Sequence, residues 1–144
     1  MNDELIEKVI QVNRVSKKIK GGNKIGFSVL VVVGDKKGKV GVGLGKAIDV
    51  ASAVKKGSSY AKKHMIAVNM TKTTIPHQVL KKKGAAIVLL KPAPPGTGIR
   101  AGGAVRSVVE AVCIKDIVSK ILGTDNKASN VYATFEALKM LEDA

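Results

Sequence analysis

The chain has 144 residues, of which 45% are hydrophobic but only 3% aromatic, and its formal net charge is +14. Positive charge in this excess indicates a polyanionic partner, nucleic acid first and an anionic membrane surface second. We expect neither a membrane-spanning segment nor a secretory signal peptide, and the single cysteine, Cys113, excludes an internal disulfide and fits a reducing cytosol.

The positive charge is concentrated in the first half. Residues 1–72 hold 15 basic and 5 acidic side chains, whereas residues 73–144 hold 10 and 6. Only Arg14, Arg100 and Arg106 are arginines. Because lysine binds phosphate as a point charge and arginine binds it in a bidentate way, we expect a mainly sequence-independent field with a few fixed contacts at the arginines.

The first half predicts three strands and a helix. Residues 1–8 are read as a frayed helical turn, and residues 9–20 are rich in β-branched side chains typical of a strand. Residues 25–33 predict a central strand that is buried on both faces. A turn at 34–38 and a strand at 39–45 lead to a helix at 47–65 with Asp49 in its first turn. The unit ends near residue 68, and the polar stretch 69–74 predicts a domain boundary.

The predicted hairpin tip is basic and rich in glycine. Gly21 and Gly22 indicate a turn, and lysines flank it on both sides. Such a thin loop can lie between phosphates, which we favour over the alternative of an ordinary solvated tip.

The strand at 39–45 alternates apolar residues with Gly41, Gly43 and Gly45, so one of its faces is bare backbone. We interpret this face and the basic helix after it as a support for an anionic backbone; the alternative is close packing of strand against helix. A Walker loop is excluded because Val40 and Ala47 break its spacing, and Lys46 breaks the dinucleotide fingerprint. The helix lysines Lys55 and Lys56 are candidate contacts or a solvated face.

The second half predicts an open β-β-α-β-α sheet with its helices on one face. Strands are expected at 75–80, at an edge because of Pro76, at 85–90 and at 114–122, with a basic turn at 81–84. Helices are expected from residue 103, on the spacing of its valines, and at 128–141, capped by Thr124, Asp125 or Asn126.

The long Pro- and Gly-rich loop at 91–103 ends at a helix start. Free N–H groups after Gly102 and Gly103, beside Arg100 and Arg106, would suit a phosphate. A connecting loop that packs on a neighbouring protein is an equal alternative.

The residues for catalysis or metal binding are not in a recognisable pattern. No cysteine lies near His64 or His77 in the sequence, and no acidic residue lies at a telling spacing from them. Glu110 and Asp116 look isolated, and Cys113 is expected to be a small buried residue. The scarcity of aromatic side chains makes base stacking a poor fit. We therefore expect no enzyme, no cofactor and no small-molecule substrate, but recognition of structured RNA through its backbone and shape.

Five motifs occur in the order expected for one family. They lie at residues 12–17, 20–22, 32–35, 38–46 and 96–103. Together they resemble bacterial small-subunit ribosomal protein five, and the resemblance spans about residues 4–141. The chain departs from the family where Lys24, Lys39, Lys62 and Lys63 replace frequent arginines.

The resemblance implies an α+β fold with a double-stranded-RNA-binding-like domain at residues 4–68 and a C-terminal α+β domain at residues 73–144. It implies a cytoplasmic component of the small ribosomal subunit that binds small-subunit ribosomal RNA, stabilises the head relative to the body and contributes to decoding accuracy. Small-subunit proteins four and eight would be its neighbours. In relatives the hairpin tip lies by the RNA bound by spectinomycin.

Two groups of site residues follow from these patterns and the resemblance. The RNA-binding candidates are Arg14, Ser16, Lys17, Lys18, Lys20, Gly21, Gly22, Asn23, Lys24, Lys46, Lys55, Lys56 and Arg100. The candidates for a protein-partner or accuracy-linked surface are Thr97, Gly98, Ile99, Gly102, Gly103 and Arg106. Two other functions are weighed: a free double-stranded-RNA-binding regulator, and a nucleotide-using enzyme, which the failed motif spacings disfavour.

Overall fold

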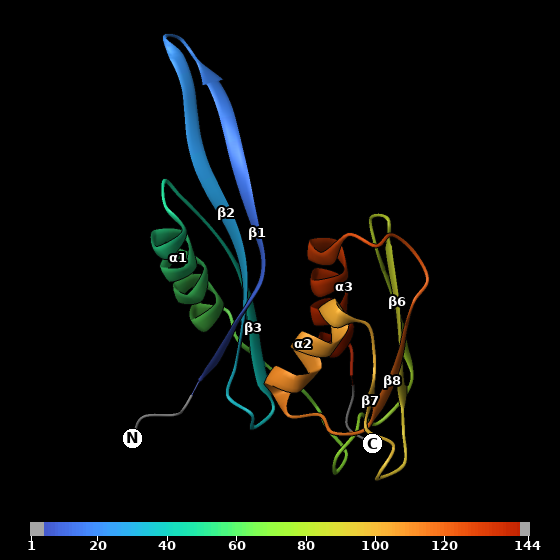
Figure 1. Cartoon of the computed structure of the whole chain (residues 1–144). Coiled ribbons are helices and arrows are strands. Elements are labelled where there is room, and N and C mark those ends of the chain that lie inside the picture. The colour runs from blue at the N-terminus through green and yellow to red at the C-terminus, as the bar shows by residue number, and fades with distance from the viewer. Residues whose placement is uncertain (1–4, 142–144) are drawn as a thin grey trace.

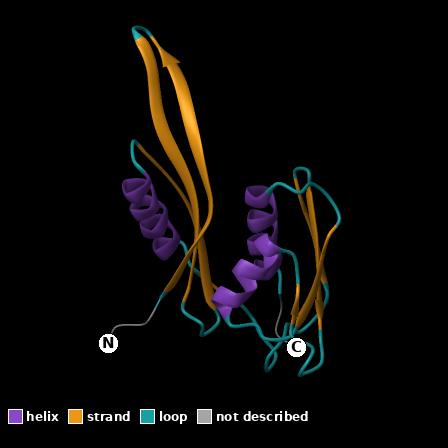
Figure 2. Ribbon diagram, viewed as in Figure 1, coloured by secondary structure: helices purple, strands orange, loops and turns teal. Residues whose placement is uncertain are grey.

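The computed structural model describes residues 5–141, and within this range the side chains of residues 17–19 and 23–24 are outside the description. Four layers follow one another across the molecule: helix α1, a first sheet, the helices α2 and α3, and a second sheet (Figures 1 and 2). The predicted α+β class is confirmed, and the two middle helices are covered by a sheet on each side.

The first sheet is antiparallel, with the strand order β1-β2-β3-β4. Its strands are β1 (Ile6–Ile19), β2 (Gly22–Gly34), β3 (Lys39–Ala47) and the short β4 (Ile66–Ala67). Residues 6–8 pair with the end of β2, so the helical turn predicted there is wrong for these residues. Their backbone groups gain ladder partners that a frayed turn would lack.

Strand β2 is central and, over residues 28–33, buried on both faces as predicted, whereas Ile25 at the outer end of the predicted strand is 42% exposed. Val29 and Val31 pack with Ala53 of helix α1 (Val50–Lys63), whereas Leu30 and Val32 belong to the larger core on the other side. All four of these β2 side chains are at most 1% exposed. Because neighbouring residues of a strand point to opposite faces, β2 contributes to two cores at once.

Helix α1 lies on the glycine face of β3. A Cβ atom added to Gly41, Gly43 or Gly45 would overlap backbone carbonyl oxygens of α1. The bare face is therefore filled by the chain's own helix, and our interpretation of it as a support for an anionic partner is wrong. Close strand–helix packing, the alternative, is what the structure shows.

The N-terminus of α1 also differs from the prediction. Asp49 is the N-cap rather than a residue of the first turn, and its carboxylate accepts a hydrogen bond from the Ser52 N–H at 3.4 Å. A cap outside the helix satisfies an N–H group that would otherwise have no partner.

The second sheet has the order β5-β6-β8-β7, from β5 (Val79–Lys83), β6 (Ala86–Pro92), β7 (Ile99–Arg100) and β8 (Ile117–Ile121). The first predicted strand is displaced: Lys81, Lys82 and Lys83 lie in β5, and the turn is at residues 84–85. Pairing with β6 determines this register. Pro76 lies outside the ladder, because proline has no N–H to donate to a neighbouring strand. Strand β7, parallel to β8, was not predicted.

Helices α2 (Gly103–Val112) and α3 (Lys127–Lys139) lie between the two sheets. The N-cap of α3 is Asn126, one of the three predicted candidates, whose side chain accepts from the Ser129 N–H at 3.1 Å. The β-β-α-β-α order is confirmed, with β7 as an addition. The strand predicted from residue 114 begins instead at Ile117, since Ile114 is 1% exposed in the core after α2 ends.

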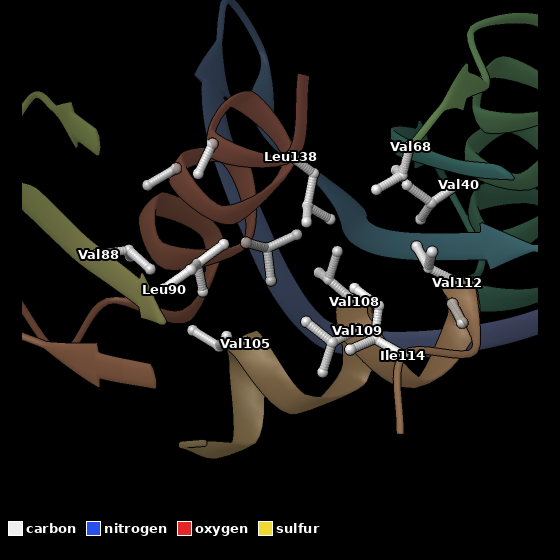
Figure 3. Packing of buried hydrophobic residues seen from close by; sticks show 14 of the residues in the cluster. Val40, Val68, Val88, Leu90, Val105, Val108, Val109, Val112, Ile114 and Leu138 are labelled. Atoms are coloured by element: carbon white, nitrogen blue, oxygen red, sulfur yellow. The ribbon is translucent and has the colours of Figure 1, made fainter. Parts of the chain in front are cut away.

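The larger core joins both halves of the chain. Val40 and Val68 lie with Val112 and Leu138 in one buried cluster (Figure 3). Helix α2 approaches the first sheet so closely that a Cβ on Gly34 would overlap the Ala111 carbonyl. The two sheets therefore share one apolar interior. None of the helices in the described part of the chain is long and apolar enough to cross a membrane.

Candidate nucleic-acid interface

The β1–β2 hairpin projects as a ribbon beyond the rest of the fold (Figure 1). Strand β3 pairs with β2 only from Phe27 onward, so residues 15–26 pair only with each other. At the tip, Gly21 and Gly22 have φ angles of +104° and +148°, conformations that other residues rarely adopt. Nothing lies within 4 Å of a Cβ at either glycine, so the tip is open to a partner.

The predicted contact residues lie along this ribbon. Arg14, Ser16 and Lys20 are exposed. The backbone register pairs Lys17 with Lys24 and Lys18 with Asn23, whereas the side chains of these four residues lie outside the described part of the structure. The ribbon thus brings this part of the predicted site together at one projecting end.

Two further predicted lysines lie at the base of the ribbon. The Lys56 ammonium on α1 donates a hydrogen bond to the backbone oxygen of Lys46 at 3.2 Å. Both side chains border a shallow hollow whose floor is apolar, formed by Val15, Ile25, Phe27, Ala47 and Ile48. Lys55 is exposed on the same helix. These lysines extend the basic surface from the hairpin onto α1.

The remaining predicted residues lie elsewhere. Arg100 is exposed on β7, at the outer edge of the second sheet, and is not brought to the hairpin (Figure 1). Thr97, Gly98 and Ile99 precede it, and Gly102, Gly103 and Arg106 follow at the start of α2. The predicted residues therefore form two separate surfaces.

The loop before β7 is held by a carboxylate that sequence reasoning had left isolated. Asp116 accepts hydrogen bonds from the Thr73 hydroxyl at 2.6 Å and from the N–H groups of Gly96 and Gly98 at 3.1 and 2.9 Å. These bonds, with that from Thr73 first, lower the pKa of Asp116. Gly96 and Gly98 have positive φ angles of +94° and +80°, so the loop needs glycine where it turns toward the carboxylate.

Glu110 is not isolated either. Its carboxylate accepts from the Lys8 ammonium of β1 and from Arg106 Nε at 2.8 Å, and the bond from Lys8, then that from Arg106, lowers its pKa. The network ties α2 to the first sheet. The sequence predicts Arg106 beside a phosphate at the helix start, but in the structure its Nε donates to Glu110 instead.

The N-terminus of α2 is open. Its N-cap, Gly102, contributes no side-chain hydrogen bond, and both Gly102 and Gly103 are exposed. Cys113, expected to be buried, is only half-buried and ends α2 with a left-handed φ of +76°. No group of His, Cys, Asp and Glu in residues 5–141 is arranged to hold a metal ion.

Sequence reasoning missed the partners that hold the surfaces in place. Thr73 and Asp116 are 43 residues apart, and Lys8 and Glu110 are 102 apart, so no local spacing reveals them. A local signal existed for Arg106 and Glu110, and also for Tyr60 and His64, because each pair is spaced i, i+4 on a helix or at its end.

Comparison with known proteins gives a consistent result. Residues 5–69 match the family model described as "Ribosomal protein S5, N-terminal domain", and residues 81–144 match "Ribosomal protein S5, C-terminal domain". A Chloroflexus aurantiacus protein named "Small ribosomal subunit protein uS5" is 53% identical over 135 residues, which is 94% of this chain and 76% of that protein.

Proteins of the same name from two Dehalococcoides mccartyi strains are 51% and 50% identical over 140 residues, which is 97% of this chain and 81% of each relative. Alignments of this length span both sheets. The chain therefore belongs to the ribosomal protein S5 family.

Proposed function

We propose that this protein is a structural, non-enzymatic component of the small ribosomal subunit in the cytoplasm. It binds small-subunit ribosomal RNA, stabilises the head relative to the body and contributes to translational accuracy. The observation that carries the proposal is the 53% identity, over 94% of the chain, to a protein named for this subunit. The net charge of +14 supports it, since a polyanionic partner is what such a charge requires.

The main RNA contact is assigned to the ribbon and its base. Arg14, Ser16 and Lys20 are exposed on a ribbon that is too thin to have a core of its own. The full set is the one predicted from the sequence: Arg14, Ser16, Lys17, Lys18, Lys20, Gly21, Gly22, Asn23, Lys24, Lys46, Lys55 and Lys56, with Arg100 as a separate contact. A narrow basic tip can enter between RNA segments that a globular surface cannot approach.

The second surface is assigned to a protein neighbour and to accuracy. It comprises Thr97, Gly98, Ile99, Gly102, Gly103 and Arg106, with small-subunit proteins four and eight as the neighbours. Asp116 supports this assignment because it holds the loop in one geometry without the partner. A surface organised in advance loses less conformational entropy on binding.

The two proposed domains are residues 4–68 and 73–144. The separate family matches to residues 5–69 and 81–144 support this division. Both regions contribute to one buried core, which would hold the two proposed surfaces at a fixed separation.

The test is sedimentation of the tagged chain from a lysate through a density gradient at low and high salt. We expect it to stay with the small subunit after a high-salt wash. The double variant Arg14→Ala/Lys20→Ala should be lost at a lower salt concentration, because each phosphate contact contributes roughly one unit to the salt slope.

The matched control is Lys91→Ala/Lys120→Ala, which removes two exposed charges from the second sheet. Equal loss of both variants would contradict the assignment to the ribbon. A chain that sediments free, or that spreads over all cellular RNA, would contradict the ribosomal role and favour a free duplex-binding regulator.

A further inference from the structure

We propose that the exposed flank of α1 at Tyr60, together with His64 at the end of the helix, forms an aromatic binding site for one unpaired nucleotide of RNA. Tyr60 and His64 stack against the base or ribose, and Lys56 and Lys63 hold the flanking phosphates. This inference rests on the proposed function for the identity of the ligand as RNA. It goes beyond that function in assigning a stacking site where the composition had made stacking a poor fit.

The two rings form an ordered pair. Their centroids are 4.0 Å apart and their planes differ by 20°. The Nδ1 atom of His64 lies 2.9 Å from the Tyr60 carbonyl oxygen. Because a carbonyl can only accept, Nδ1 carries the hydrogen, and this bond fixes both the tautomer and the orientation of the imidazole. The Nε2 atom is then the ring nitrogen that remains available to a ligand.

The pair takes no part in either core. Helix α1 packs through Ala53, Gly57 and Ala61, which are spaced by four residues and are buried against β2 and β3. Tyr60 is 52% exposed and His64 is also exposed. A large aromatic surface left in solvent while small residues do the packing is typical of a binding surface.

The charges around the rings favour an anionic ligand. Lys55, Lys56 and Lys63 border a shallow hollow together with Ser59 and Tyr60. Among residues 5–141 none of these three lysines forms an ion pair with a carboxylate. Lys62, at the neighbouring position, pairs with Glu7 at 2.8 Å instead. Positive charge beside an open aromatic face is the combination that proteins use to bind single nucleotides of RNA.

The surface is continuous with the ribbon. Lys56 borders both this hollow and the one at the base of the ribbon, where it bonds to the Lys46 carbonyl. An RNA strand that contacts the ribbon base can therefore pass along α1 to the rings without leaving basic surface.

The test uses the full chain at low salt and two RNA probes. One is a duplex of about 16 base pairs, the length that such domains span, and the other is the same duplex with one unpaired uridine. The chain has no tryptophan, so the variant Tyr132→Phe leaves Tyr60 as the only tyrosine fluorophore. Its emission should be quenched by the bulged duplex more than by the plain one.

Affinity gives the decisive comparison. Tyr60→Leu should lower affinity for the bulged duplex roughly tenfold and leave affinity for the plain duplex nearly unchanged. Tyr60→Phe, which keeps the ring, should retain binding. If Tyr60→Leu binds the bulged duplex as tightly as the parent, the stacking site is wrong.

The ribbon variant Arg14→Ala/Lys20→Ala separates this outcome from failure of the proposed function. If it weakens RNA binding and subunit association while Tyr60→Leu does not, only the stacking site is excluded. If neither variant affects RNA binding and the parent does not sediment with the small subunit, the proposed function and the stacking site are both wrong.

Discussion

The carbonyl oxygen of Gly57 in α1 occupies the space that a side chain on Gly43 of β3 would need. The same relationship recurs one helical turn away in each direction, where Gly41 meets Ala61 and Gly45 meets Ala53. The helix therefore lies directly on the backbone of the strand, and the glycines set the spacing between the two layers.

Replacing Gly43 with alanine should consequently destabilise the protein. Its Cβ would also come within 2.8 Å of the Ala61 nitrogen, so α1 must shift. We expect the free energy of unfolding in urea to fall by about 1–3 kcal/mol. The control is Gly103→Ala, where a Cβ meets nothing within 4 Å; it should be neutral or slightly stabilising in helix α2. Equal losses for the two variants would contradict this packing.

Neighbouring valines of β2 should affect different halves of the molecule. Val32 packs in the core with α2 and α3, whereas Val31 packs under α1, and both are fully buried. Each change to alanine should cost about 2 kcal/mol. In native-state hydrogen exchange, Val32→Ala should reduce protection of α2 and α3 more than Val31→Ala does. Identical protection patterns would mean that the two cores do not open separately.

Removing the charge of Asp116 should loosen the loop before β7. Asp116→Asn weakens the acceptor for the Gly96 and Gly98 N–H groups, so their exchange rates, measured by NMR, should rise roughly tenfold. The control is Asp125→Asn, which changes an exposed carboxylate. Unchanged exchange in Asp116→Asn would show that the turn holds its shape without the carboxylate.

The free energy of unfolding should decrease when the pH falls below about 4. Bonds from Lys8 and Arg106 lower the pKa of Glu110, and bonds from Thr73 and Gly98 lower that of Asp116. Because the pKa of each carboxylate is lower in the folded state, the unfolded chain binds more protons at acid pH. The contribution of each carboxylate to stability is therefore complete above the ordinary pKa of about 4. It is lost as the pH falls through the folded-state pKa.

Variants separate the two carboxylates. In Glu110→Gln, the loss of unfolding free energy between neutral and acid pH should be smaller than in the parent by less than about 1 kcal/mol, because the partners of Glu110 are partly exposed. High salt should reduce this effect further by screening the ion pairs. The effect of Asp116→Asn should resist salt, since its donors are a hydroxyl and two backbone amides. The same salt response in both variants would contradict this assignment.

Elements with a strong local pattern were predictable. The apolar run of β2, the Gly21–Gly22 tip and the valine spacing of α2 each define their element without reference to the rest of the chain. Strands β4 and β7 have two residues each and exist only through their partners, so no periodicity could show them. The run of three lysines before Gly84 reads as a turn by composition, and only its register with β6 places it in a strand.

The position of the hairpin tip in the candidate site was predictable, but the contacts that support the two candidate surfaces were not. Gly21 and Gly22 located the hairpin tip, and the glycine alternation of β3 correctly indicated that something approaches closely. A pattern of bare backbone does not identify what approaches, and the answer was α1. The roles of Glu110 and Asp116 depend on partners that are distant in the sequence, and neither composition nor local spacing predicts such long-range contacts.

The shared core has a consequence for synthesis. In the described part of the chain, α2 and α3 of the second half cover the face of the first sheet that includes Leu30, Val32 and Val40, with Leu138 among the covering residues. A nascent chain that has already formed the first sheet therefore keeps this apolar face uncovered until α3 has emerged. Folding of the interior therefore waits for the synthesis of α3, and a chaperone that shields β-sheet faces would act in that interval.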